Sequence, residues 1–289
     1  MRIHEYGDAD VIRLDEVPLP AGGEVLIKVA ATSFNPSDIG IRRGFLRVDL
    51  PYAFGIDLAG TVVATGDRVI GRVDTGGTAA EYVTAPAGTL VAAPTTVPLP
   101  DAAAIPIAGL TAWQAVFDHA QVEPGQRVLV NGAGGGVGGV GGFAVQLAKH
   151  AGAYVIATAS PRSAETVRSL GADEVIDYTA APLTVAEPVA VLLHLVPGPA
   201  PVAAVRPGGV IVSVTGPVEA TGPADADLPV TTSHFVARND TTQLAALVGL
   251  IDAGVVRLDI AARRPLAELA SVHRDAEAGR LRGKTIIVP

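Results

Sequence analysis

The glycine-rich segment 128–138 constrains the fold more than any other part of the chain. It reads Val-Leu-Val-Asn-Gly-Ala-Gly-Gly-Gly-Val-Gly, and helix-like spacing begins directly after it. A strand that leads through a glycine turn into a helix leaves backbone N–H groups and the positive end of the helix dipole facing outward. Only a turn without side chains lets a diphosphate approach these groups closely. The segment therefore predicts a dinucleotide site. The expected contacts are Ala133, Gly134, Gly135, Gly136, Val137 and Gly138.

The tandem repeat over 135–142 leaves two registers of this fingerprint open. The first register places Ala133, Gly135 and Gly138 at the key positions, and we favour it. A glycine-rich segment by itself is equally typical of a flexible connection, so the flanking strand and helix carry the interpretation.

Alternating apolar runs and helix-length intervals continue through 107–255, which is the pattern of βαβ units on a parallel sheet. We expect strands at 127–131, 154–158, 174–178, 189–195 and 210–214. In the helix after the glycine turn, Val140, Ala144, Leu147 and Ala148 share one face, and Gln146, Lys149 and His150 are expected to face elsewhere. Gly152 ends this helix.

A second domain is predicted from the remaining sequence, since 289 residues correspond to roughly two domains. Residues 1–106 contain short apolar runs broken by Gly, Pro, Asn and Asp, which indicates an antiparallel, partly open β domain. The tail 256–289, with a helix at 265–278 and a strand at 285–288, is expected to rejoin it. The fold class is therefore α/β, a partly open β domain plus a doubly wound parallel sheet.

Composition excludes several classes of function. The chain has 21 basic and 29 acidic residues, a net charge of −8, and no Lys/Arg run longer than two, so nucleic acid is not an expected partner. Cysteine is absent, which excludes disulfides and thiolate zinc sites. No apolar stretch approaches the ~20 residues that span a bilayer, and the first residues lack the apolar core of a signal peptide. We therefore expect no membrane association and a cytoplasmic location.

The residues after the second strand of the parallel sheet indicate which dinucleotide binds. An acid there would bond the ribose 2′-hydroxyl of NAD and repel the 2′-phosphate of NADP. The chain instead reads Ser160-Pro161-Arg162, which offers a hydroxyl and a guanidinium to a phosphate. Ser160 could at the same time cap the next helix, with Pro161 in its first position. We favour NADPH.

Eight short motifs occur in the order typical of one enzyme family. They are Asn-Pro-Ser-Asp at 35–38, Gly-Ile-Asp-Leu-Ala-Gly at 55–60, Gly-Asp-Arg-Val at 66–69, Ala-Glu-Tyr-Val at 80–83, Gly-Leu-Thr-Ala at 109–112, Ala-Val-Gln-Leu-Ala-Lys at 144–149, Leu-Gly-Ala-Asp at 170–173 and Arg-Gly-Lys at 282–284. Together they make the chain similar, along nearly its whole length, to the zinc-free quinone oxidoreductase (zeta-crystallin-like) branch of the medium-chain dehydrogenase/reductase superfamily.

This resemblance implies a GroES-like, partly open β-barrel domain (1–106 and 256–289) and a Rossmann NADP-binding domain (107–255). It implies hydride transfer from NADPH to a quinone or an α,β-unsaturated carbonyl. No metal site is expected, because Ser37 and Ile56 stand where zinc-dependent relatives carry ligands, and the six His residues are far apart in sequence. The family also implies a homodimer through the edge of the Rossmann sheet, near 230–236.

Site residues follow from the same resemblance. Asn35 would reach cofactor and substrate, unless it only forms an Asn-Pro turn. Thr111 would supply a hydroxyl beside the nicotinamide, unless it only caps a helix. Tyr52 could touch substrate, and Asp57 is expected to hold its domain together. Residues implied around the cofactor are Ser160, Arg162 and Tyr178 at the 2′-phosphate, and Val196, Thr215, His234, Phe235 and Val236 elsewhere along it.

Other functions stay open. An enoyl reductase, or a dedicated reductase of one natural product, is hardly separable by sequence from a quinone reductase. A protein that binds NADPH without turnover is a further alternative. A short-chain reductase is disfavoured, because none of the five Tyr residues has Lys four positions later. One departure from the family stands out: His194 replaces an acidic residue common at the end of the fourth strand.

Overall fold

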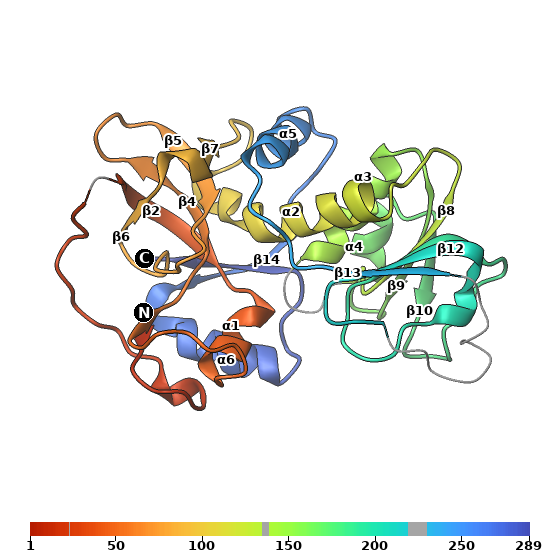
Figure 1. Cartoon of the computed structure of the whole chain (residues 1–289), viewed down its shortest axis with the longest axis horizontal. Helices are drawn as coiled ribbons and strands as arrows, with labels where there is room; N and C mark the ends of the chain where they lie inside the picture. The colour runs from red at the N-terminus through yellow and green to blue at the C-terminus, as the bar shows by residue number, and fades with distance from the viewer. Residues whose placement is uncertain (23, 135–138, 219–229) are drawn as a thin grey trace. The chain divides into compact units, whose positions relative to one another are not determined.

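The computed structural model describes residues 1–22, 24–134, 139–218 and 230–289. The chain divides into two compact units, coloured along the sequence in Figure 1. The first comprises Met1–Ala108, Asn239–Gly254 and Leu258–Pro289, and the second comprises Gly109–Arg238 and Val255–Arg257. This division differs from the expected one at 239–254, which lies in the first unit.

Hydrogen bonds to Asp252 explain where 239–254 belongs. Helix α5 (Thr241–Asp252) ends at this residue, and Asp252 Oδ1 accepts hydrogen bonds from the backbone N of Thr95 at 2.8 Å and of Thr96 at 3.0 Å. These bonds tie α5 to the segment after β7 (Leu90–Ala92) of the first unit. Such long-range contacts are not visible in a pattern of apolar residues.

The second unit is built on a six-stranded, wholly parallel sheet, as predicted. In spatial order its strands are β10 (Glu174–Asp177), β9 (Tyr154–Ala159), β8 (Arg127–Asn131), β11 (Val189–His194), β12 (Val205–Ser213) and β13 (Thr231–His234). In chain order this is 3-2-1-4-5-6, the doubly wound arrangement. The chain reverses its direction of winding between β8 and β11, and ligands of such sheets bind at the carboxyl ends of the strands at this point.

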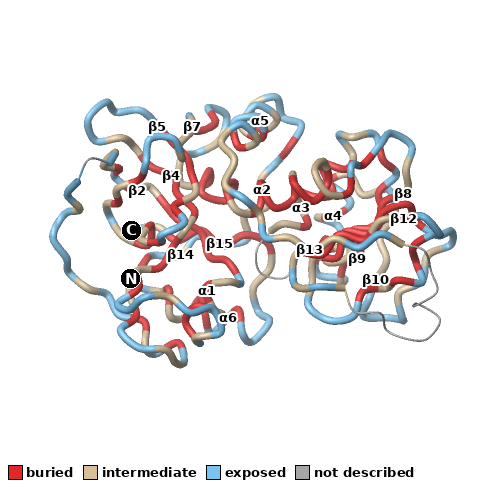
Figure 2. The backbone as a smooth tube through the Cα atoms, viewed as in Figure 1, coloured by how far each residue is buried: buried red, intermediate tan, exposed pale blue. Residues whose placement is uncertain are grey.

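Helices and an apolar core cover this sheet. Helix α3 (Val140–His150) packs on β8 and β9, and α4 (Ala164–Ser169) packs on β9 and β10. Helix α2 (Pro106–Trp113) continues into a π-helical turn (Gln114–His119), and a 3₁₀ turn lies at Val202–Ala204. Figure 2 shows the central strands as buried. Their side chains form one core of Leu129, Ile156, Val189, Leu192, Ala200, Val202, Ala204, Val205 and Ile211.

One residue of α3 departs from the expected pattern. Gln146 was expected to face away from the core, but it is buried. Its Nε2 donates to Arg257 O at 3.0 Å, and its Oε1 accepts from Arg257 N at 2.8 Å. The prediction was wrong because the short segment 255–257 returns to this unit and needs partners for its backbone groups.

The first unit contains a seven-stranded sheet. Its path runs β14 (Ile260–Pro265), β15 (Lys284–Val288), β2 (Val25–Ser33), β4 (Asp57–Val62), β5 (Arg68–Arg72) and β7, and β6 (Tyr82–Ala85) also pairs with β2. All pairings are antiparallel except β14 with β15. The C-terminal strand β15 therefore lies against β2, and the core beside it consists of Ile27, Val29, Leu58, Val69, Val73, Val83 and Ala85.

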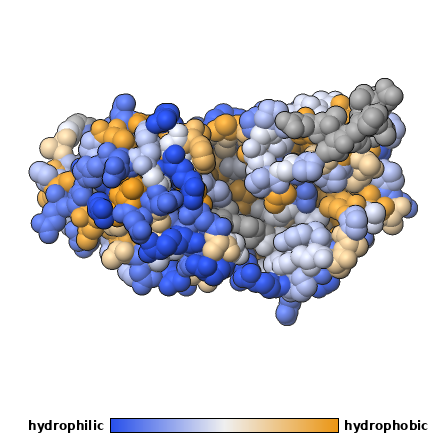
Figure 3. Space-filling view, turned by 90° about the horizontal axis from the view of Figure 1, so that it is seen from below, coloured by the Kyte–Doolittle hydropathy of each residue, from blue (hydrophilic) through white to orange (hydrophobic). Residues whose placement is uncertain are grey.

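Smaller elements complete the first unit. Strands β1 (Arg2–Ile3) and β3 (Tyr52–Ala53) form a separate pair. Helix α1 (Pro36–Arg42) begins with Pro36 in its first position, and α6 (Leu269–Glu277) follows a 3₁₀ turn at Leu266–Glu268. Further 3₁₀ turns lie at Ala9–Val11, Ala87–Thr89 and Leu99–Ala104. In Figure 3 the visible face of this unit carries hydrophobic residues scattered among hydrophilic ones. Among the described helices, none has the length and apolar character to cross a membrane.

Candidate functional site

Two positions of the turn after β8, Gly132 and Gly134, have no room for a side chain. Gly132 has φ +100°, and a Cβ on it would lie 2.6 Å from Val196 Cγ1. A Cβ on Gly134 would collide with the hydroxyl of Ser163. Gly134 N donates to Thr158 O at 3.0 Å, which ties the turn to β9. Close packing therefore requires glycine at positions 132 and 134, as in the glycine turn of a dinucleotide-binding fingerprint.

The remaining predicted residues of this turn, Gly135, Gly136, Val137 and Gly138, lie outside the described residues. Helix α3 begins after Gly139, whose φ is +72°. The choice between the two registers of the repeat therefore stays a prediction.

Residues expected at a 2′-phosphate lie at the ends of two neighbouring strands. Ala159 of β9 pairs in register with Asp177 of β10, so the next residues, Ser160 and Tyr178, leave adjacent strands at the same edge of the sheet. Tyr178 is 57% exposed, and Arg162 is also exposed. The structure thus brings Ser160 and Tyr178 together at the carboxyl edge, with Arg162 in the turn that follows β9.

Ser160 is not the helix cap that the sequence suggests. Helix α4 begins at Ala164, after Ser163. The carbonyl oxygen of Ser160 accepts from the backbone N of Ser163 and of Ala164, each at 3.0 Å. A turn over 160–163 therefore separates β9 from α4 and leaves the Ser160 hydroxyl without a capping bond among the described residues.

A groove of about 390 Å³ opens at the same edge. It is lined by Asn131, Tyr178, Thr179, Ala180, Ala181, Pro182, Leu183, Pro199 and Pro201. Thr179 shapes one wall, because its N and Oγ1 both donate to Asp177 Oδ1, at 2.9 and 2.6 Å. These bonds lower the pKa of Asp177. The groove has a mixed polar and apolar lining and lies beside β8, the strand that leads into the glycine turn.

Two other predicted residues adjoin the glycine turn. Val196 contacts Gly132, as the collision with an added Cβ shows, and Thr215 Oγ1 donates to Val196 O at 3.0 Å. Val196 and Thr215 follow β11 and β12, so they reach the turn across the reversal point of the sheet.

The segment His234, Phe235 and Val236 follows the edge strand β13. Phe235 stacks on His119 with ring centroids 4.0 Å apart and an interplanar angle of 18°. His119 Nδ1 in turn lies 3.0 Å from Ser233 Oγ. Val236 is 82% exposed and offers an unpacked apolar side chain.

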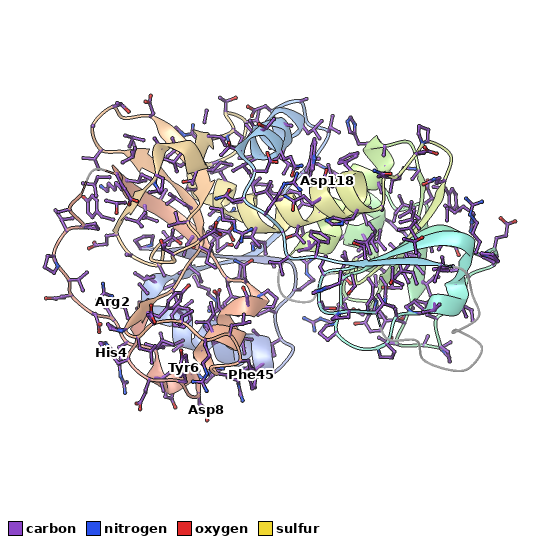
Figure 4. The ribbon with its side chains drawn as sticks, viewed as in Figure 1. Arg2, His4, Tyr6, Asp8, Phe45 and Asp118 are labelled. Atoms are coloured by element: carbon purple, nitrogen blue, oxygen red, sulfur yellow. The ribbon has the colours of Figure 1, made fainter. Side chains whose placement is uncertain are left out.

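The π-helical turn fixes the end of that segment. Gln114 Nε2 donates to Arg238 O at 3.0 Å, and Gln114 Oε1 accepts from Arg238 N at 3.0 Å. Asp118, labelled in Figure 4, adds an ion pair with Arg238 at 2.8 Å. Thr111 is buried within α2, upstream of Gln114, and cannot be a helix cap because α2 begins at Pro106.

In the first unit, Asn35 belongs to a buried polar network. Its Nδ2 donates to Asp57 Oδ2 at 2.8 Å, and its Oδ1 accepts from Lys284 Nζ at 2.6 Å. Asp57 also accepts from Ile107 N at 2.8 Å and from the Ser33 hydroxyl, and lies 3.4 Å from Lys284 Nζ. A cation on one side and a carboxylate on the other hold the Asn35 amide in a single orientation. Asp57 thus has the structural role that its sequence context suggested.

Two titratable groups adjoin this network. Asp38 Oδ2 accepts from Asn35 N at 2.9 Å, while its Oδ1 is buried with no hydrogen-bond partner among the described residues. Burial raises the pKa of Asp38 to about 7. Burial, and then the charge of Asp38, raise the pKa of Tyr52 to about 12, so its hydroxyl stays protonated at neutral pH. Asn35 and Tyr52 both lie in the first unit, as predicted from their positions in sequence.

Several residues of the site were not identified from the sequence. Lys284 was noted only as part of a motif, and Thr158, Asn131 and Gln114 were not singled out. The sequence signal that could have identified these residues is a polar residue near the end of an otherwise apolar strand or helix. Among the described residues no group of three or more His, Cys, Asp or Glu could hold a metal ion, and Ser37 lies on α1 without such neighbours.

Two family models match parts of this chain. A profile of the alcohol dehydrogenase GroES-like domain matches residues 21–95, and one of a zinc-binding dehydrogenase matches residues 170–287. A quinone oxidoreductase from Coxiella burnetii has a similar structure, with a TM-score of 0.88 and 30% identity, covering 100% of this chain and 98% of that one.

Two curated relatives illustrate the range of named activities. The chloroplastic quinone-oxidoreductase homolog of Spinacia oleracea is 40% identical over 194 residues, which are 60% of this chain but only 58% of that protein. The chloroplastic NADPH-dependent alkenal/one oxidoreductase of Arabidopsis thaliana is 31% identical over 99% of this chain and 78% of its own length.

Replacing Asp38 by Asn should remove a pH-dependent loss of stability. Because its folded pKa of about 7 exceeds the unfolded value of 3.8, the folded state holds a proton that the unfolded state releases, so stability falls between about pH 4 and pH 7. Asp38→Asn keeps the acceptor for Asn35 N. Urea unfolding should show the variant gaining up to about 4 kcal/mol relative to wild type as pH rises from 4 to 7, and no more above.

Asp177→Asn is the matched control, because hydrogen bonds lower the pKa of Asp177 and the sign of the effect is opposite. If the difference in free energy of unfolding between Asp38→Asn and wild type stays constant from pH 4 to 8, the carboxyl of Asp38 is not buried without compensation, and the prediction fails.

Proposed function

We propose that this chain, which belongs to the quinone oxidoreductase branch of the medium-chain dehydrogenase/reductase superfamily, is an NADPH-dependent, zinc-independent reductase of quinones or α,β-unsaturated carbonyls. The observation that carries this proposal is the closely packed glycine turn at 132–134. It stands at the reversal point of a 3-2-1-4-5-6 parallel sheet, where such sheets bind dinucleotides.

The residues around that turn support a dinucleotide with a 2′-phosphate. The glycine turn would face the diphosphate while the N–H groups of Gly132 and Gly134 keep their bonds to Thr158, and the groove beside Tyr178 would receive the adenine end. No acid follows β9; the hydroxyl of Ser160 and the guanidinium of Arg162 take that place. NADPH, when bound, supplies the hydride.

The chain's own residues would orient the acceptor and polarise its oxygen. Asn35 is held in one orientation by Asp57 and Lys284, and its Nδ2 lies 3.5 Å from Ser33 O, so the hydrogen on this weak contact is the one that it could offer to an acceptor. Tyr52 keeps its proton at neutral pH, so its hydroxyl can donate a hydrogen bond to an acceptor oxygen. No group with the character of a dedicated acid is required, because water can protonate an enolate or hydroquinone oxygen. Thr111 is proposed at the nicotinamide.

The relatives' names favour two acceptor classes, quinones and conjugated enals or enones. The test is NADPH oxidation followed at 340 nm with a panel of each class. We expect turnover with at least one class, and no loss of activity after treatment with a metal chelator. Binding of NADPH without oxidation by any acceptor would instead favour the non-catalytic alternative.

Arg162→Ala should separate the two nicotinamide cofactors. Loss of a charge-assisted contact to the 2′-phosphate should raise the Kd of NADPH about 10-fold or more and leave that of NADH within about twofold. Arg206→Ala, which changes an exposed arginine of β12, is the control and should alter neither. Equal weakening of NADPH and NADH would reject the 2′-phosphate assignment.

We also propose a homodimer through β13. This strand ends the sheet order, so one of its edges carries backbone groups that no other strand of this sheet uses. Sedimentation equilibrium should give twice the chain mass of 29.2 kDa, and Thr232→Pro, at an exposed position whose N–H faces away from β12, should shift the species toward a monomer. A monomer at all micromolar concentrations would contradict the proposal.

A further inference from the structure

Three polar side chains form a row across the reversal point of the parallel sheet. Thr158, Asn131 and His194 lie near the carboxyl ends of the adjacent strands β9, β8 and β11. His194 pairs in register with Asn131, and the pairing of Val130 with Ala157 places Asn131 beside Thr158. Residues in register on parallel strands point to the same face, so these side chains are neighbours. Thr158 and His194 are buried.

At each end of the row, a side chain forms a hydrogen bond with a backbone group. Gly132 N donates to Thr158 Oγ1 at 2.8 Å, and Thr158 Oγ1 lies 3.0 Å from Asn131 Oδ1. Asn131 Nδ2 lies 3.0 Å from His194 Nδ1, and His194 Nε2 lies 3.0 Å from Gly198 O. Four hydrogen bonds thus connect the first residue of the glycine turn with the loop after β11.

The direction of every bond follows from the two ends. Gly132 N–H can only donate, so Thr158 accepts and its own hydroxyl proton is available for Asn131 Oδ1. Gly198 O can only accept, so His194 carries its proton on Nε2 and, when neutral, accepts on Nδ1 from Asn131 Nδ2. The Gly198 end sets this arrangement, and the bond from Gly132 N to Thr158 is compatible with it. The chain of bonds therefore runs in one direction, from Gly132 to Gly198, and each bond polarises the next.

Both ends of this chain belong to parts of the proposed cofactor site. Gly132 opens the glycine turn. Gly198 lies in the loop whose Pro199 and Pro201 line the groove, and Asn131 lines it as well. Residues 197–201, which read Pro-Gly-Pro-Ala-Pro, are thus hydrogen-bonded to His194 through Gly198.

Backbone bonds already hold the strand ends without this row. Leu195 N donates to Asn131 O at 2.9 Å, and Gly134 N donates to Thr158 O at 3.0 Å. The side-chain row is therefore additional to the pairing of the strands. The row adds a side-chain connection that fixes the distance between the turn at Gly132 and the loop at Gly198.

We infer that Thr158, Asn131 and His194 are positioning residues that set the glycine turn and the groove loop at a fixed spacing for one dinucleotide. This inference rests on the proposed function. Removing one member leaves its neighbours without a partner and breaks the direction of the whole row, so the three residues act as a unit.

Isosteric substitutions test the row. Thr158→Val keeps the shape and removes the hydroxyl, whereas Thr158→Ser keeps the hydroxyl. We expect Thr158→Val to raise the Kd of NADPH, measured by titration calorimetry, about 10-fold, as for one buried hydrogen bond left unmade. Thr158→Ser should stay within about twofold of wild type. His194→Leu should resemble Thr158→Val, and His194→Gln, which can accept and donate in the same places, should recover most of the affinity.

The double variant Thr158→Val/His194→Leu distinguishes a unit from two separate structural roles, because the two side chains meet only through Asn131. A unit predicts a Kd close to that of either single variant, whereas independent effects multiply to about 100-fold. Multiplied effects, or equal affinities of Thr158→Val and Thr158→Ser, would overturn the inference.

Nuclear magnetic resonance of the cofactor-free wild type supplies a measurement that needs no altered protein to fold. With imidazole ¹⁵N labels, and His194 assigned by its loss in His194→Gln, we expect hydrogen on Nε2 and none on Nδ1. Hydrogen on Nδ1 would contradict the row. If the ring is as expected but wild type binds neither NADPH nor NADH, the proposed function fails and the directed row of hydrogen bonds stands.

Discussion

The turn after β8 must fit closely between the strands on either side of it, and much of the second unit follows from this requirement. Gly132 adopts φ +100°, lies against Val196 and donates its N–H to Thr158, so no other residue fits there. The central strands β8, β9 and β11 are buried and accordingly consist of apolar runs. Polar residues occur at the carboxyl ends, where the strands leave the core.

The first unit differs from the second because it buries charged side chains. Asp57 and Lys284 are almost fully buried, and each is stabilised by partners from several segments of the chain. Removing water from such charges is costly unless their hydrogen bonds are satisfied. The Asn35 amide lies between them and uses both its ends. The same contacts that stabilise the buried charges therefore also orient the residue proposed to face the acceptor.

Local patterns were sufficient where burial alone decides structure. The strand at 127–131 was predicted with both of its ends, and the strands at 154, 174 and 189 with their starts, because apolar runs bounded by turn residues define them. Patterns failed where a distant segment supplies the partner. Gln146 is buried because 255–257 returns to α3, and α5 joins the first unit through Thr95 and Thr96. Helix α4 begins at Ala164 because a turn intervenes after Ser160.

The sequence by itself determined the parallel sheet, its glycine turn, the absence of thiolate metal ligands and the lack of an acid after β9. These features depend on residue type and short-range spacing, which one chain displays directly. Only the tertiary structure decided which polar residues meet. Thr158, Asn131 and His194 are separated by at least 27 residues from one to the next, and Asn35 and Lys284 by 249. Strand order and register bring them together, and neither is encoded in any single segment.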